Sequence, residues 1–358
     1  MRHRLIAALA VASVSLGLLG AAAPAHAAPD VRTAGGLLDW IGAHPGRAGI
    51  AVVRSGGRSL LSQSAQRRFP LASTRKVLIV GAYAEAVAAG TLDPAQPVAL
   101  ADVERYYLPG TDGGAHPAAV EEWAARGTVT GAPGAEVVPL DELARAAIVQ
   151  SDNAAADYLL VRLGAETVTA FAASNRMARQ DPPAPLLGEY LAWTQRTPAA
   201  WAALTPAQRA RQAFRLAAAG EPATSFPGVA RQRRFVRSSV AGTPADWARL
   251  MARIGRGQGL SPAAAAVLRR HLEWQREFPK VAATFSRLGD KGGSLPGSVT
   301  EAAHVTAKGR PGIAVAVFLR ELPPRIERSV PKSASTQRLI LRLTADPAFL
   351  ARARRSLG

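Results

Sequence analysis

The amino-acid sequence predicts an α+β fold: an antiparallel sheet formed by the N- and C-terminal segments with flanking helices, and a mainly helical subdomain inserted between them. Short runs typical of strands occur near the N-terminus and again after Phe285. Between them the apolar spacing is that of helices. A final amphipathic segment from about Ser335 to Arg354, with a possible break at Pro347, is expected to cover the sheet.

Residues 1–27 are interpreted as a secretory signal peptide. Arg2 to Arg4 precede an apolar stretch from Leu5 to about Gly20, and Ala25-His26-Ala27 has the small-residue pattern of a cleavage site. A transmembrane helix is less favoured, because the apolar core is short and Pro24 interrupts its end. No other segment is apolar enough to span a bilayer. We expect cleavage near Ala27 and a secreted or cell-envelope protein without a membrane anchor.

The mature chain, 28–358, is expected to be one domain. Its sheet subdomain comprises about 28–70 and 285–358, and its helical subdomain about 71–284. The net charge of +18 has two readings, an arginine-rich genome or affinity for anionic polymers of a bacterial envelope. Nucleic acid is not an expected partner, since the arginines are scattered and aromatic residues make up only 6%. There is no cysteine, and a monomer is the default expectation.

The first elements are a hairpin and a helix. Gly49 to Arg54 and Ser59 to Ser64 are separated by the turn-forming run Ser55-Gly56-Gly57-Arg58, which predicts a β-hairpin. A helix is predicted from Ser73 to Ala89, and Gly90 ends it.

The middle of the chain is predicted to be mostly helical. Helices are expected over Leu140–Val149 and Ala154–Leu163, and Thr205-Pro206 and Thr243-Pro244 begin two more. From Ala172 to Thr194 the helical pattern degrades, and we expect a loop there.

A turn-rich loop from Tyr106 to Gly114 carries two tyrosines, for which a packed corner is favoured over substrate contact. The strands expected near the C-terminus are Arg287–Lys291, Glu301–Thr306 and Gly312–Leu319.

Ser73 stands three residues before Lys76 at the start of the first predicted helix. Residues at this spacing lie on the same face. A serine hydroxyl becomes nucleophilic when a base takes its proton, and a neutral lysine can be that base. Only five of the 44 basic residues are lysine, and lysine, unlike arginine, can lose its proton in a desolvated site. We therefore interpret the pair as catalytic rather than as an ordinary helix end.

Three motifs occur in order: Ser73-x-x-Lys76, Ser151-Asp152-Asn153 and Lys291-Gly292-Gly293. Each alone is also found in turns, helix ends or bulges. Together they resemble the S-x-x-K, S-D-N and K-T-G motifs of class A β-lactamases and penicillin-binding proteins. The likeness covers most of the mature chain, because the hairpin, the helical middle and the terminal sheet follow the same order. It implies a β-lactamase/transpeptidase-like fold.

The resemblance implies roles for the matching residues. Ser73 would be the nucleophile that forms an acyl-enzyme, and Lys76 its base or proton relay. Ser151 would carry a proton between Ser73 and the leaving nitrogen. The backbone N–H groups of Ser73 and Ser294 would form the oxyanion hole.

The same resemblance implies a substrate-binding set. Asn153 would hydrogen-bond the substrate amide, since a carboxamide both donates and accepts. Lys291 would attract a substrate carboxylate and help lower the pKa of Lys76. Gly292 and Gly293 would let the substrate lie along the strand as an extra edge.

The sequence departs from the family pattern in three places. The family usually has a hydroxyl residue at the position of Gly292, and Ser294 is a possible substitute. Class A β-lactamases carry a glutamate that activates the deacylating water. Glu189 has roughly the right place, although the surrounding run is out of register, and it could instead be a surface charge. The segments around 106–135 and 196–234 are extra relative to the family.

The leading functional expectation is a secreted serine hydrolase that acylates on Ser73 and hydrolyses a β-lactam or a related small amide or ester. A D-Ala-D-Ala cell-wall peptidase, acting on a peptidoglycan-like substrate, is the second reading. A non-catalytic envelope-binding protein on the same scaffold is the third. We expect no cofactor, and the six histidines have no metal-ligand spacing.

Overall fold

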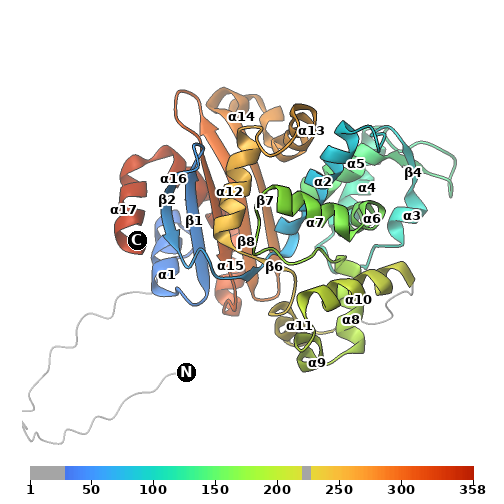
Figure 1. Ribbon diagram of the computed structural model, residues 1–358, viewed down its shortest axis with the longest axis horizontal. Coiled ribbons are helices and arrows are strands. Elements are labelled where there is room, and N and C mark those ends of the chain that lie inside the picture. The colour runs from blue at the N-terminus through green and yellow to red at the C-terminus, as the bar shows by residue number, and fades with distance from the viewer. Residues whose placement is uncertain (1–28, 220–226) are drawn as a thin grey trace, which may run out of the picture.

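A computed structural model of the chain describes residues 29–219 and 227–358, so the predicted signal peptide lies outside the described residues. The central sheet is antiparallel, with the strand order β2-β1-β9-β8-β7 (Figure 1). Its strands are β1 (Ala48–Arg54), β2 (Ser59–Gln63), β7 (Phe285–Leu295), β8 (Ser298–Ala307) and β9 (Ile313–Leu319). The N-terminal hairpin and the C-terminal strands thus share one sheet, which confirms the predicted fold class.

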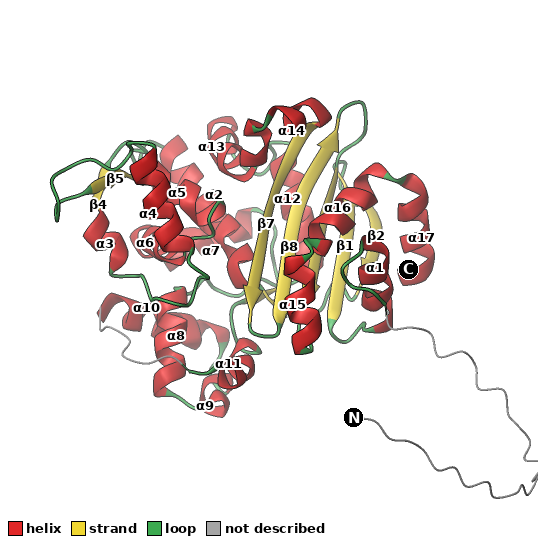
Figure 2. Cartoon of the chain, turned by 180° about the vertical axis from the view of Figure 1, so that it is seen from behind, coloured by secondary structure: helices red, strands yellow, loops and turns green. Residues whose placement is uncertain are grey.

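The two faces of this sheet belong to different apolar cores, because successive side chains of a strand point to opposite sides. Ile50 and Val52 of β1 lie in a core with the helices at the chain ends, which Figure 2 shows lying over the sheet. Those helices are α1 (Ala34–Ala43), α15 (Pro324–Lys332), α16 (Ser335–Ala345) and α17 (Pro347–Leu357). Ala51 and Val53 face the opposite core, together with Trp247 of α12 (Pro244–Gly255).

The inserted helical part is organised around α2 (Lys76–Ala88), whose first nine residues are all buried. It packs against α5, α6, α7 and α13. The elements of this part are α3 (Leu100–Glu104), α4 (Ala115–Ala125), α5 (Leu140–Ile148), α6 (Asn153–Leu163), α7 (Ala165–Ser174), α13 (Pro262–Leu272), η2 (Trp274–Glu277), α14 (Pro279–Thr284), and the short strands β4 (Pro97–Ala99) and β5 (Val137–Pro139). Of the helices in the described part of the chain, none is both long and apolar enough to cross a membrane.

A smaller helical layer lies at one end of the molecule and has its own core, built on Trp193, Trp201 and Phe235 (Figure 1). It contains α8 (Leu186–Gln195), α9 (Pro198–Ala202), α10 (Pro206–Ala219) and α11 (Val229–Val236). Helices α8 and α10 cross closely at Gly188, where a Cβ atom would overlap the carbonyl oxygen of Ala213. The extra segment 196–234 of the sequence therefore forms most of this layer.

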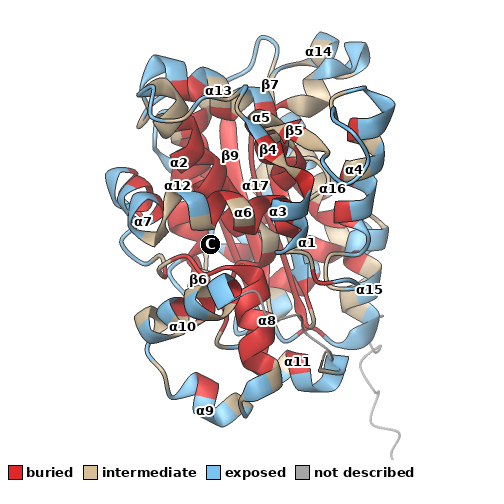
Figure 3. Ribbon diagram, turned by 90° about the vertical axis from the view of Figure 1, so that its right-hand side faces the viewer, coloured by how far each residue is buried: buried red, intermediate tan, exposed pale blue. Residues whose placement is uncertain are grey.

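The predicted hairpin, the helices in the middle, the last strand and the break before Pro347 are confirmed, and β7 and β8 are longer than predicted. The loop expected over Ala172–Thr194 is wrong, because α7 extends to Ser174 and α8 begins at Leu186. Helix α8 is buried on nearly all sides, as Figure 3 shows. An apolar residue at almost every position removes the helical periodicity on which the sequence prediction depends.

Candidate active site

A cavity of about 500 Å³ lies where the start of α2 meets the free edge of β7. A single 3₁₀ turn, η1 (Ala72–Arg75), leads into α2 and carries Ser73. Ala72, the residue before Ser73, has a left-handed φ of 48°. Such backbone strain is often stored at functional sites. The cavity lining includes most of the predicted site residues, namely Ser73, Ser151, Asn153, Lys291, Gly293 and Ser294.

Lys76 lies buried behind this lining. Its Nζ atom donates to the carbonyl oxygen and, at 3.3 Å, to the hydroxyl of Ser151, and at 2.7 Å to Oδ1 of Asn153. Burial, and then the positive charge of Lys291, lowers the pKa of Lys76 well below its usual value, and nearby aspartates only partly oppose this. A lowered pKa makes the neutral amine, which has a free lone pair, easier to reach than for an exposed lysine.

Ser151 connects the two lysines. Its hydroxyl lies 3.3 Å from Nζ of Lys76 and accepts from Nζ of Lys291 at 3.0 Å. The residue has a φ of +66°, in the left-handed region, at the junction of α5 and α6. The next residue, Asp152, holds this turn, because its carboxylate accepts from the Ala154 N–H at 2.8 Å and contacts Nδ1 of His116 at 2.9 Å. The sequence Ser-Asp-Asn thus orients one hydroxyl and caps the helix that follows.

Strand β7 packs directly on the turn that carries Ser73. A Cβ atom on Gly293 would lie 2.6 Å from the backbone nitrogen of Ser73 and 2.9 Å from that of Thr74, so only glycine permits this approach. Hydroxyl groups fix the same junction: Oγ1 of Thr74 lies 2.8 Å from Oγ1 of Thr300, which donates to the Leu71 carbonyl at 2.8 Å. The glycine therefore sets the distance between β7 and Ser73.

Lys291 is 5% exposed, and its Nζ atom donates to Ser151 and, at 2.7 Å, to the carbonyl oxygen of Gly292. Burial lowers the pKa of Lys291 to about 8, and the neighbouring carboxyl groups of Glu301 and Asp290 oppose a larger shift. Lys291 is thus a partly desolvated cation that titrates close to neutral pH.

Glu301 accounts for the missing hydroxyl side chain at position 292. It stands directly opposite Gly292 in the β7–β8 pairing, and a Cβ atom there would lie 2.9 Å from Oε2 of Glu301. Oε2 also accepts from Nε2 of Gln337 at 2.5 Å. Burial and then the nearby Asp290 raise the pKa of Glu301 well above its usual value. A carboxyl group therefore occupies the space that a side chain at 292 would need.

Glu189 is the one predicted catalytic residue that the structure does not bring into this group. It is 2% exposed, and it lies beside Arg75 rather than in the cavity lining. One carboxylate oxygen is 2.6 Å from a guanidinium nitrogen of Arg75, and the other accepts from the Ser239 hydroxyl at 2.9 Å and the Val240 N–H at 3.3 Å. It is not a surface charge, and its carboxylate is engaged by a buried ion pair with Arg75 and by Ser239 and Val240.

The helix face that does reach the cavity carries Leu186 and Tyr190. These positions are three before and one after Glu189, and Asp157 fixes the start of the helix by accepting from the Leu186 and Leu187 N–H groups at 2.9 and 2.7 Å. Sequence reasoning missed both residues, because the loop predicted there has no definite faces.

Other lining residues were also missed, and they come from a loop, from β8 and from the start of α16: Thr111, Asp112, Gly113, Thr300, Glu301, Thr336 and Gln337. The tyrosines of the 106–114 loop do not line the cavity. Tyr107 packs on His116 with ring centroids 4.6 Å apart, and Tyr106 packs edge-on against Tyr158 at 6.2 Å. This confirms the packed corner that the sequence favours.

Solved structures that resemble this fold include β-lactamases. The β-lactamase from Sphaerobacter thermophilus matches with a TM-score of 0.57 at 21% identity, over 86% of this chain and 96% of that one. A variant of the last common ancestor of Gram-negative bacteria class A β-lactamase matches with a TM-score of 0.53 at 22% identity, over 89% and 99%. A β-lactamase from Chitinophaga pinensis matches with a TM-score of 0.54 at 17% identity, over 85% and 98%.

At these identities, the structural matches establish the fold. No curated protein matches the sequence of this chain significantly. The sequence model described as the β-lactamase enzyme family matches residues 36–345, which span both the sheet and the helical part. The chain therefore belongs to the β-lactamase enzyme family.

Proposed function

We propose that the protein is an exported serine hydrolase that forms an acyl-enzyme on Ser73 with a β-lactam or a related amide or ester. The observation that supports this most strongly is that Nζ of Lys76 and Nζ of Lys291 both donate to the Ser151 hydroxyl, while Ser73, Ser151 and Lys291 line one cavity. Export rests on the N-terminal pattern of residues 1–27.

Acylation would begin when the lone pair of Lys76 takes the proton of the Ser73 hydroxyl as its oxygen attacks the substrate carbonyl carbon. The backbone N–H groups of Ser73 and Ser294 would stabilise the oxyanion of the tetrahedral intermediate. As the C–N bond breaks, the proton would pass from Lys76 through the Ser151 hydroxyl to the leaving nitrogen. Lys291 and Asn153 would hold the substrate at the edge of β7.

Deacylation is the step that this site supports less well. The carboxyl groups lining the cavity are those of Asp112 and Glu301. Asp112 is engaged by the Gly114 and His116 N–H groups at 3.0 and 2.9 Å, and Glu301 lies behind Gly292. A water that attacks the acyl-enzyme would therefore lack a well-placed carboxylate base, so we infer a long-lived adduct and slow turnover.

The lack of a well-placed carboxylate base also favours a second candidate, a D-Ala-D-Ala cell-wall peptidase. An enzyme of that kind would use the same three motifs without the deacylating glutamate. The space taken by Glu301 at position 292 also supports a substrate other than a β-lactam carrying a carboxylate. Both candidates share acylation on Ser73 and differ in the natural acyl donor.

An intact-mass time course with a penicillin tests the proposal. The mature protein is expected to gain the mass of one opened penicillin, and the gain should persist for minutes or longer. Ser73→Ala is the matched control and should gain nothing. Rapid loss of the adduct with accumulation of hydrolysed drug would contradict slow deacylation. An adduct that forms equally on the Ser73→Ala protein would refute the nucleophile.

A further inference from the structure

A second cavity, of about 470 Å³, lies between the small helical layer and the end of the sheet, separate from the lining that contains Ser73. Its walls come from the start of β1, the residues before β3 (Phe69–Pro70), helices α10 and α11, and the end of β9. Its cationic residues are Arg47, Arg68, Arg209, Arg233, Arg237 and Arg320, whereas its acidic residues are Asp181 and Glu321.

Three of the six guanidinium groups have carboxylate neighbours. Arg68 pairs with Asp181, Arg233 pairs with Glu327 outside the cavity, and Arg237 lies 3.5 Å from Glu321. Within the part of the chain that the structure describes, Arg47, Arg209 and Arg320 have no carboxylate at ion-pair distance. The cavity therefore holds a surplus of positive charge.

This surplus is costly where the guanidinium groups are partly buried. Burial lowers the pKa of Arg320, and the nearby cations Arg67 and Arg237 lower it further, with Glu321 opposing them. Burial likewise lowers the pKa of Arg209, and the more distant carboxylates of Asp181 and Glu189 only partly oppose this. Arg320 is also held in place, since its guanidinium donates to the Gly46 and Arg68 carbonyls at 3.1 Å each and lies 5.0 Å above the ring of Phe69. A bound anion would relieve the repulsion without moving these groups.

The arginines are not spread evenly over the cavities of the described residues. Among the described residues, the cavity at Ser73 is lined by no arginine, and its basic and acidic residues are Lys291, Asp112 and Glu301, although most of the 44 basic residues of the chain are arginine. A further hollow of the described residues is also rich in arginine, being lined by Arg269, Arg270, Arg276 and Arg287, but three of these four have a carboxylate at ion-pair distance. The arginine cavity differs because three of its six guanidinium groups have none in the described part of the chain. Arginine presents a planar fork of donors that matches the oxygen atoms of phosphate.

We propose that this arginine cavity binds an oxyanion carrying at least two negative charges, of the phosphate or phosphodiester class. The extra segment 196–234 would contribute to function by supplying Arg209 and Arg233 to it. The site is distinct from the acylation cavity, so binding does not depend on the proposed serine chemistry. Two sources share this ligand chemistry, a small free phosphate compound and a phosphodiester polymer.

Titration calorimetry of the mature protein with inorganic pyrophosphate, and separately with poly(glycerol phosphate), tests the proposal. Arg47→Gln/Arg209→Gln removes two of the unpaired guanidinium groups and is expected to weaken binding at least tenfold. Ser73→Ala should bind like the parent protein. If poly(glycerol phosphate) binds more tightly per phosphate group than pyrophosphate does, the ligand is a phosphodiester polymer. If the two probes bind equally, the ligand is a small phosphate compound.

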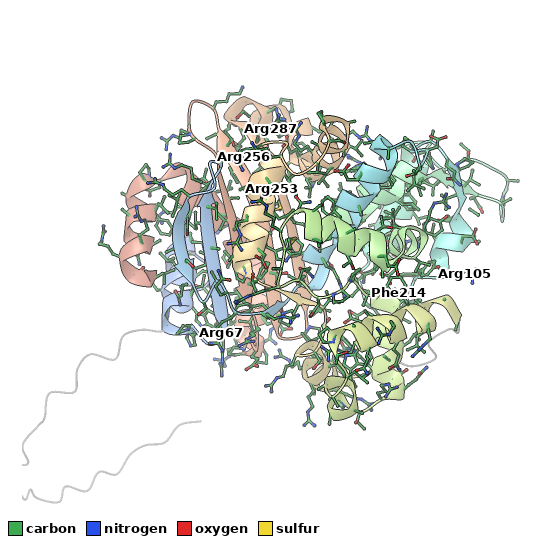
Figure 4. The ribbon with its side chains drawn as sticks, in the orientation of Figure 1. Arg67, Arg105, Phe214, Arg253, Arg256 and Arg287 are labelled. Atoms are coloured by element: carbon green, nitrogen blue, oxygen red, sulfur yellow. The ribbon has the colours of Figure 1, made fainter. Side chains whose placement is uncertain are left out.

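Arg105→Gln/Arg256→Gln is the control for net charge, because it removes two exposed arginines that Figure 4 shows on other parts of the surface. Arg256 follows the C-terminal end of α12, a helix of 12 residues that is about 18 Å long. Arg256 therefore lies about 18 Å from the N-terminal end of this helix, which is the end on the side of the cavity. This control should retain binding. Absence of binding to both probes, or an equal loss in the two double variants, would overturn the proposal. Circular dichroism verifies that each variant is folded.

Discussion

Replacing Gly293 by alanine should impair acylation through a small displacement of β7. The added Cβ would lie 2.6 Å from the Ser73 nitrogen, whereas ordinary contacts of a Cβ atom begin at 3.4 Å, so the strand and the turn must separate by about 0.8 Å. A misplacement near 1 Å can reduce a rate by about 100-fold. We expect a 10- to 100-fold loss of the acylation rate constant, which corresponds to about 1.4–2.7 kcal/mol in the barrier.

Gly292→Ala is the matched control, because it adds the same methyl group one residue earlier on the other face of β7. There the new Cβ would lie 2.9 Å from a terminal oxygen of the Glu301 side chain rather than from the backbone of η1. Stopped-flow acylation by a chromogenic β-lactam measures the rate of each variant, and thermal unfolding measures stability. Parent-like acylation by a folded Gly293→Ala protein, or a larger loss in Gly292→Ala, would refute the reasoning.

Two further predictions concern charged groups near the cavity. Because burial lowers the pKa of Lys291 to about 8, its ammonium is lost above that pH, and KM for an anionic β-lactam should rise between pH 7 and 9. The Lys291→Arg variant keeps its positive charge, so its KM should stay constant over that range. A KM that rises equally with pH in both proteins would exclude deprotonation of Lys291 as the cause. Glu189→Gln should destabilise the fold by about 3–5 kcal/mol, because it leaves Arg75 buried without a counter-charge. It should leave the decay of the acyl adduct nearly unchanged, and a marked slowing in a folded variant would restore Glu189 as the deacylating base.

The sequence was most informative where the chemistry is local. Ser73 and Lys76 are separated by one turn, so a nucleophile and its base can be proposed from their spacing alone, whereas the role expected for the Ser151 hydroxyl came from the resemblance of the Ser-Asp-Asn run to the family motif. Gly293 was also predictable as a position without a side chain. Its partner, the backbone nitrogen of Ser73, could not be read from the sequence, because a contact between β7 and η1 joins residues more than 200 positions apart.

The residues that escaped prediction depend on which side of an element faces the cavity. Glu189 was chosen from a segment that was expected to be a loop, and a loop does not separate side chains onto distinct faces as a helix does. On α8, Leu186 and Tyr190 face the cavity while Glu189 faces Arg75. The role of Glu301 depends on strand register, since a shift of one residue would turn it away from Gly292.

The most direct test of the account is the acylation rate of Lys76→Arg, measured in a single turnover with a penicillin. Arginine keeps the positive charge and a similar reach, but it cannot give up its proton to act as a base. General-base catalysis is worth about 100- to 10,000-fold, so we predict a loss of at least 100-fold in a protein that remains folded. Acylation at close to the parent rate would contradict the assignment of Lys76 as the base that activates Ser73.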